Sequence, residues 1–133
     1  MRFTRFLRNA QNILIKAESG NPTGLTGIYQ HPNPRPALLA VYNATLKELE
    51  TSFPKSSVYR QSVENIVNAR KTIVEQNEVT EIIESKIGNG LIEEILIQAG
   101  DEYDLVKKMA EWKPWEELEE KPLADQWKYF EKE

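Results

Sequence analysis

The stretch LIEEILIQAGDEYDLVKKMA, from Leu91 to Ala110, carries the clearest helical pattern in the chain. Apolar residues recur in it at steps of three and four, the spacing that places side chains on one face of an α-helix. They are Leu91, Ile92, Ile95, Leu96, Ala99, Tyr103, Val106, Met109 and Ala110. Acidic residues in the first turn and lysines near the end suit the helix dipole. We therefore predict one long amphipathic helix here.

Glycines mark the start and the middle of this segment. Gly88-Asn89-Gly90 precedes it, and we expect Gly88 to end one helix and Asn89 to cap the next, since glycine tolerates positive φ and asparagine is a common N-cap. Gly100 costs about 1 kcal/mol relative to alanine inside a helix. A neighbouring helix that approaches closely at Gly100 would explain it.

Two further helices are predicted upstream. The first runs over 37–53, and Pro54 ends it. The second begins with Ser56 or Ser57 as N-cap and continues to about Gln76. A short segment over 79–87 continues it after a break near Asn77.

The segments before residue 37 are rich in turn-forming residues. GNPTGLTG (20–27) and HPNPRP (31–36) together contain three glycines and four prolines, and we expect no helix to cross either of them. Nowhere does the chain alternate as a strand does between hairpin turns. We predict an all-α fold, an antiparallel three-helix bundle with extended, irregular tails. Its parts are a basic, Gly/Pro-rich segment (1–36), the bundle (37–111) and a tryptophan-containing tail (112–133).

Composition limits the function classes. With 133 residues, 40% of them hydrophobic and 29% charged, the chain suits one domain. It has no cysteine, so disulfides and thiolate-ligated metal sites are excluded. No apolar run approaches the roughly 18 residues that indicate a membrane span. The net charge of -4 argues against nucleic-acid binding, which needs a basic surface.

The first 17 residues, MRFTRFLRNAQNILIKA, are arginine-rich, free of acidic residues and amphipathic. This composition is typical of a mitochondrial targeting segment, and the alternative is an ordinary basic amphipathic helix. We expect the segment to remain on the chain and to lie on a protein or lipid surface.

Candidate catalytic residues are few. The only histidine, His31, has no nucleophile near it in sequence, and we interpret it as a loop histidine. The spacing of Gly20, Gly24 and Gly27 lacks the Lys-Ser/Thr ending of a phosphate-binding loop. Arg60 and Arg70 are the only arginines of the predicted bundle that could begin an enzyme pocket. We therefore predict no catalytic residue, no metal site and no cofactor.

The tail raises a different question. EWKPWEELEEKPLADQW (111–127) holds all three tryptophans but has two prolines and no sustained helical period. The area that three tryptophans can bury does not offset the backbone entropy of ordering such a tail, so it needs further contacts, either with the surface of its own bundle or with another protein. We expect Trp112, at the end of the apolar stripe, to lie in the core, and Trp115 and Trp127 to bind another protein.

Five short motifs, taken in order, carry a family resemblance. They are TGLTGI (23–28), PKSSVYR (54–60), LIEEILIQA (91–99), MAEWKPWE (109–116) and PLADQWK (122–128). Together they resemble the 13 kDa-type accessory subunit family of mitochondrial complex I, the NADH dehydrogenase 1 alpha subcomplex subunit 5 family. The longer N-terminal extension, the proline-rich 31–36 segment and the charged end indicate a fungal or other non-animal member.

The resemblance implies a non-catalytic accessory subunit without a cofactor. It would support assembly and stability of the peripheral arm, in the quinone module, on the matrix side of the mitochondrial inner membrane. Its partners would be other subunits of that arm, with no nucleic acid and no transmembrane segment. The interface candidates are Thr23, Gly24, Leu25, Gly27, Trp112, Trp115, Asp125, Gln126 and Trp127.

Two other function classes remain open. One is a free-standing helical adaptor or acyl-carrier-docking protein of the mitochondrial matrix, because Val58-Tyr59-Arg60 differs by one residue from a Leu-Tyr-Arg motif. The other is a small helical enzyme built around Arg60 and Arg70. An adaptor would be stable alone with a protected tail, whereas an enzyme needs a pocket with converging charged groups.

Overall fold

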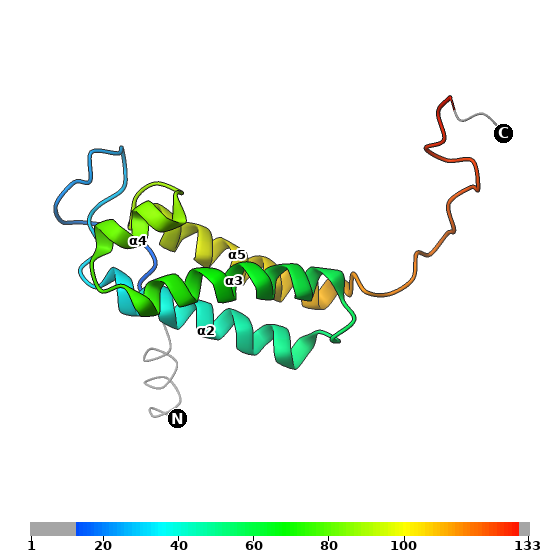
Figure 1. The fold of residues 1–133 in the computed structure, drawn as a ribbon, viewed down its shortest axis with the longest axis horizontal. Helices are drawn as coiled ribbons and strands as arrows, with labels where there is room; N and C mark the ends of the chain where they lie inside the picture. The colour runs from blue at the N-terminus through cyan, green and yellow to red at the C-terminus, as the bar shows by residue number, and fades with distance from the viewer. Residues whose placement is uncertain (1–12, 131–133) are drawn as a thin grey trace.

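A computed structural model describes residues 13–130 as four α-helices followed by a long tail (Figure 1). The helices are α2 (Pro34–Ser52), α3 (Val58–Gln76), α4 (Thr80–Ile87) and α5 (Ile92–Trp112). Over the described range the chain forms no strand, and its only β-type pairing is an isolated bridge between Pro22 and Tyr29. The all-α prediction is confirmed. Of the arginine-rich first 17 residues, predicted to be a targeting segment or a basic amphipathic helix, only 13–17 lie within the described residues.

The predicted count of three helices is not confirmed, because the 79–87 segment forms a separate helix. Asn77 has extended backbone angles and ends α3, and α4 begins at Thr80, after its N-cap Val79. Gly88 ends α4 with a φ of 75°, in the left-handed region, as its sequence position predicts. Asn89 does not cap α5. The Glu94 carboxylate instead accepts a hydrogen bond from the Leu91 N–H.

The first helix begins earlier than predicted. α2 starts at Pro34, three residues before the predicted start at residue 37 and inside the 31–36 segment, although no helix crosses that segment. A proline in the first turn of a helix lacks only an N–H that would have no partner inside the helix. Pro34 and Pro36 therefore begin α2 rather than exclude it. The N-cap of α3 is Ser57, as predicted, and its side chain accepts a hydrogen bond from the Arg60 N–H.

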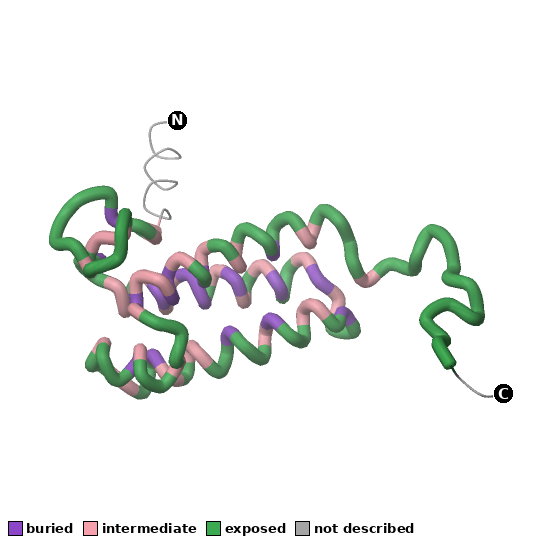
Figure 2. Tube along the Cα trace, turned by 90° about the horizontal axis from the view of Figure 1, so that it is seen from above, coloured by how far each residue is buried: buried purple, intermediate pink, exposed green. Residues whose placement is uncertain are grey.

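The three long helices lie side by side, and α2 packs against both α3 and α5. α3 runs opposite to α2 and α5 (Figure 1). Buried residues lie on the facing sides of the helices, whereas the tail is exposed along almost its whole length (Figure 2). Fully buried residues of the core include Leu38, Leu49, Val74, Ile95, Leu96 and Val106.

An extended N-terminal segment, not a helix, accounts for Gly100. A Cβ atom at this position would lie 3.1 Å from Cγ2 of Ile15. The close approach predicted at Gly100 is therefore present, but the segment around Ile15 makes it. His31 holds the same segment, because its Nε2 hydrogen-bonds the Leu14 carbonyl oxygen.

Candidate functional site

The C-terminal tail, residues 113–130, leaves the bundle at the end of α5 and extends away from it (Figure 1). Lys113 adopts a left-handed conformation with a φ of 52° and donates its N–H to the Met109 carbonyl, which ends the helix. Beyond it, the hydrogen bonds of the tail are short-range, for example from Gln126 N–H to the Leu123 carbonyl. The bundle therefore positions the beginning of the tail, but not the residues that follow.

Trp115 attaches the beginning of the tail to the bundle. Its ring packs edge-on against Phe53, with 5.2 Å between the ring centroids. Phe53 is buried at the end of α2 and also contacts Tyr59, at 5.6 Å. Trp115 is therefore partly buried against its own chain. Whether it also binds another protein stays a prediction.

The remaining apolar side chains of the tail are exposed. Leu118, Leu123 and Trp127 are each more than 70% exposed, and Tyr129 and Phe130 are exposed with them. The Trp127 ring lies edge-on to the Tyr129 ring, with 6.2 Å between the ring centroids. Asp125 and Gln126 lie in the turn just before it and are exposed. Large apolar side chains concentrated on one exposed segment are typical of protein interaction sites.

The expected core position of Trp112 is wrong. Trp112 is 65% exposed at the last position of α5. At about 100° per residue it lies roughly 160° around the helix from the buried Ile92, on the face away from the core. The angular position of residue 112 around the helix predicts its exposure, whereas its closeness in sequence to the apolar residues does not.

The four N-terminal interface candidates form a loop at the other end of the bundle. Thr23 closes this loop, since its hydroxyl donates to the Ile28 carbonyl at 2.8 Å. Gly24 and Gly27 have φ values of 97° and 77°, which other residues rarely adopt, and Leu25 is exposed between them. The glycines thus serve the turn itself.

A shallow cleft lies between this loop and the junction of α4 and α5. Thr23, Gly24 and Leu25 line one side, and Glu81, Glu84 and Glu94 contribute to the other. Two of these carboxylates hold the start of α5, because Glu84 and Glu94 accept hydrogen bonds from the N–H groups of Ile92 and Leu91. The acidic lining does not suit a phosphate. Within residues 13–130, no group of three or more His, Cys, Asp and Glu residues is placed to hold a metal ion.

The loop and the tail lie at opposite ends of the bundle (Figure 1). The structure therefore brings the N-terminal candidates together with one another, but not with the tryptophans. A single small site cannot include both. Two separate contact regions on an elongated body remain compatible with an interaction protein.

The Val58-Tyr59-Arg60 motif is used inside the fold. The Tyr59 hydroxyl donates to Glu102 on α5. Arg60 donates to the Phe53 carbonyl and pairs with Glu64, each at 2.7 Å. Because these side chains hold the bundle together, the structure offers no support for an acyl-carrier-docking role of the motif.

His31 is a buried loop residue that joins three segments. Its Nδ1 accepts a hydrogen bond from the Asn33 N–H at 3.0 Å, so Nε2 carries the proton that it donates to the Leu14 carbonyl. Its own N–H contacts the Glu93 carboxylate at 3.4 Å. Both ring nitrogens are engaged in the fold. The interpretation as a loop histidine is confirmed, although its burial was not predicted.

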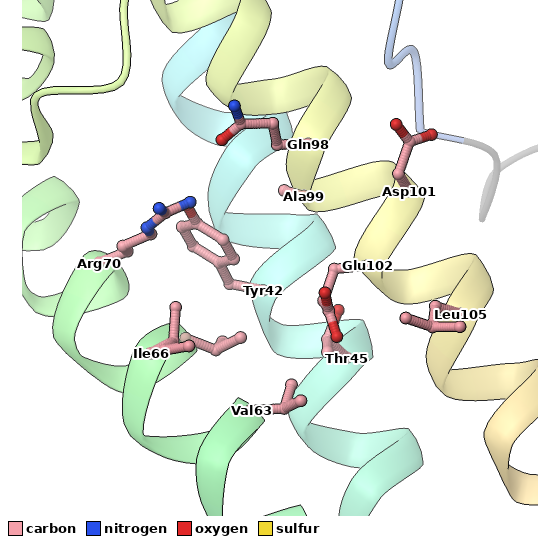
Figure 3. Close-up of a pocket in the computed structure, with 11 residues that line it drawn as sticks. Tyr42, Thr45, Val63, Ile66, Arg70, Gln98, Ala99, Asp101, Glu102 and Leu105 are labelled. Carbon is pink, nitrogen blue, oxygen red and sulfur yellow. The ribbon is translucent and has the colours of Figure 1, made fainter. Parts of the chain in front are cut away.

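Arg70 is the one candidate arginine that faces an open space. It lines a groove between α3 and α5, whose floor includes Tyr42 of α2 (Figure 3). The sequence pattern indicated Arg70 as a residue that could begin a pocket, but it did not indicate the groove. That feature depends on how far apart α3 and α5 lie, which helical periodicity does not encode.

Comparisons with known proteins find similarity to subunits of respiratory complex I. The family model described as "ETC complex I subunit conserved region" matches residues 27–94. A Candida albicans protein named NADH dehydrogenase (ubiquinone) 1 alpha subcomplex subunit MCI4 is 57% identical over 135 residues, covering 98% of this chain and 97% of the relative. The mouse protein named NADH dehydrogenase (ubiquinone) 1 alpha subcomplex subunit 5 is 38% identical over 107 residues, covering 80% of this chain and 91% of its own length.

A plant relative extends this similarity. An Arabidopsis thaliana protein whose name includes "alpha subcomplex subunit 5, mitochondrial" is 37% identical over 110 residues. The match covers 83% of this chain and 64% of the plant protein. The similarity therefore reaches across fungal, animal and plant proteins.

Proposed function

The chain belongs to the family of respiratory complex I subunits that includes alpha subcomplex subunit 5, and from this membership we propose that it supports the assembly and stability of the peripheral arm. It is a non-catalytic accessory subunit of the mitochondrial NADH:ubiquinone oxidoreductase. None of the described helices is both long and apolar enough to cross a membrane. We place it at the matrix side of the inner membrane, in the quinone module, with subunits of that arm as partners.

The three parts of the chain have different roles in this proposed function. The bundle (37–111) is the rigid body, and the regions on either side of it (1–36 and 112–133) bind neighbouring subunits. The exposed apolar side chains of the tail carry the proposal, because nothing in the described chain covers Leu123 or Trp127. A partner surface that buries them would contribute the free energy that the isolated tail lacks.

Native gel fractionation of mitochondria with the tagged chain tests this role. We expect the wild-type chain to comigrate with NADH-oxidising activity. A Leu123→Ala, Trp127→Ala double variant should lose roughly tenfold or more of that incorporation, since buried interface aromatics commonly contribute 2 kcal/mol or more. Val58→Ala is the matched control, because Val58 is similarly exposed but lies on α3.

Two results would contradict parts of the proposal. A wild-type chain that migrates as a small free protein would overturn the assembly role. A double variant that assembles as well as Val58→Ala would leave membership of the complex intact, but would exclude the tail as a principal contact.

A further inference from the structure

The groove between α3 and α5 is an open, mostly apolar space of about 440 Å³ (Figure 3). α2 packs against both flanking helices and forms the floor with Tyr42 and Thr45. α3 and α5 are joined across it by the hydrogen bond from Tyr59 to Glu102, at 3.1 Å. The bundle thus has room for one more element beside α3 and α5.

The rim of the groove is apolar and exposed. Ile66 of α3 is 54% exposed and Leu105 of α5 is 40% exposed, and both line the groove. Below them, Val63 and Val67 are buried. The two rim residues lie on different helices and face the same space, so one docked segment could cover both.

One end of the groove holds an arginine without a carboxylate partner in the described chain. Tyr42 is only 2% exposed, and its hydroxyl is the sole buried side-chain polar atom of the described chain without a hydrogen-bond partner. The Arg70 guanidinium lies beside it (Figure 3). Within residues 13–130, no carboxylate lies at ion-pair distance from Arg70. The Tyr42 hydroxyl is closed off from solvent, so the Arg70 guanidinium is the polar group at this end that a ligand can reach.

The chemistry of this end suits an anionic oxygen. Burial raises the pKa of the Tyr42 hydroxyl, and the neighbouring Arg70 opposes that shift only in part. The hydroxyl therefore stays protonated at neutral pH and does not neutralise the Arg70 charge. A carboxylate can accept hydrogen bonds from the guanidinium, whereas an ammonium group would be repelled.

The other end of the groove limits what the ligand can be. Asp101 and Glu102 line it, and Glu102 already accepts a hydrogen bond from Tyr59. These carboxylates disfavour an anionic lipid or a phosphate lying along the groove. From Val63 to Arg70 the α3 wall spans seven residues, or about 10 Å, which is the length of roughly two helical turns.

We propose that this groove is the docking site for an amphipathic helix of another complex I subunit, which covers Ile66 and Leu105 with its apolar face and places an Asp or Glu carboxylate against Arg70. Helices of this kind commonly bind in apolar grooves through residues spaced three and four apart. The inference rests on the proposed subunit role, but it concerns a surface separate from the tail.

The absence of cysteine from the chain makes an accessibility test direct. Ile66→Cys and Leu105→Cys are introduced singly, and labelling with a maleimide is followed in the purified chain and in purified complex I. We expect labelling in the complex to be about tenfold slower or more at both positions, because it then requires local opening of the docked helix. Adding Arg70→Glu to Ile66→Cys should restore rapid labelling, whereas Lys71→Gln, one residue away and outside the groove, should not.

The occupant is identified by a benzophenone maleimide attached to Ile66→Cys and photolysed in the complex. A cross-linked peptide from another subunit, with an acidic residue in a helical apolar pattern, is the expected result. A cross-link to residues 113–130, to a second copy of the chain or to lipid would overturn the proposal. Equal labelling rates in the free chain and in complex I would also overturn it, while comigration with the complex would leave the proposed function standing.

Discussion

At the scale of single residues, Arg35 connects the start of α2 to the end of α3. Its Nε lies 3.1 Å from the carbonyl oxygens of both Val74 and Asn77, and one Nη donates to the Glu75 carbonyl. Carbonyl groups at a helix C-terminus lack partners inside the helix and carry partial negative charge, so a guanidinium group stabilises them. Counted from sequence alone, Arg35 was one more basic residue of the N-terminal segment.

We predict that Arg35→Gln lowers the free energy of unfolding by about 1 to 2 kcal/mol, because it removes a charged donor from three carbonyl groups. Thermal unfolding of the purified chain, followed by circular dichroism, measures the change as a fall of roughly 5 °C in Tm. Lys47→Gln is the control, since Lys47 is an exposed cation on α2 without an ion pair in the described chain. Equal effects of the two changes would assign the loss to net charge rather than to the carbonyl contacts.

At the scale of helices, periodicity and caps predicted most of what forms. The end of α3 at Gln76, the N-cap Ser57 and the left-handed Gly88 all depend on residues close in sequence. The start of α2 was misplaced because proline permits the first turn of a helix and excludes only later positions. The role of Gly100 could not be derived, since Ile15 is far from it along the chain and meets it only in the fold.

Gly100 provides a prediction at this scale. Alanine is favoured over glycine by about 1 kcal/mol inside a helix, but its Cβ would press against Ile15. We expect Gly100→Ala to change the stability by less than about 0.5 kcal/mol in the natural chain and to stabilise an Ile15→Ala chain by about 1 kcal/mol. A double-mutant cycle by urea unfolding measures this coupling. Additive effects would show that the Ile15 side chain moves aside without cost.

At the scale of the whole molecule, the sequence predicted the class of fold and the family, but not the surfaces. The tail was expected to bind a partner through Trp115 and Trp127, and the structure separates the two: one ring packs on Phe53, and the other is exposed. The groove at Arg70 also escaped prediction. The Trp115 contact and the groove both depend on how segments far apart in sequence pack together, which local sequence patterns do not encode.

The difference between the packed Trp115 and the exposed remainder of the tail leads to a prediction. Removing residues 117–130 should leave the unfolding free energy of the isolated chain within about 0.5 kcal/mol of the natural value, since its apolar side chains are exposed. Trp115→Ala should lower it by about 1 to 2 kcal/mol, because a partly buried ring is lost from Phe53. In mitochondria we expect the opposite ranking. The shortened chain should lose more of its incorporation into complex I than the Trp115→Ala chain does. Urea unfolding and native gels measure the two properties, and a shortened chain as unstable as Trp115→Ala would mean that the tail belongs to the fold rather than to an interface.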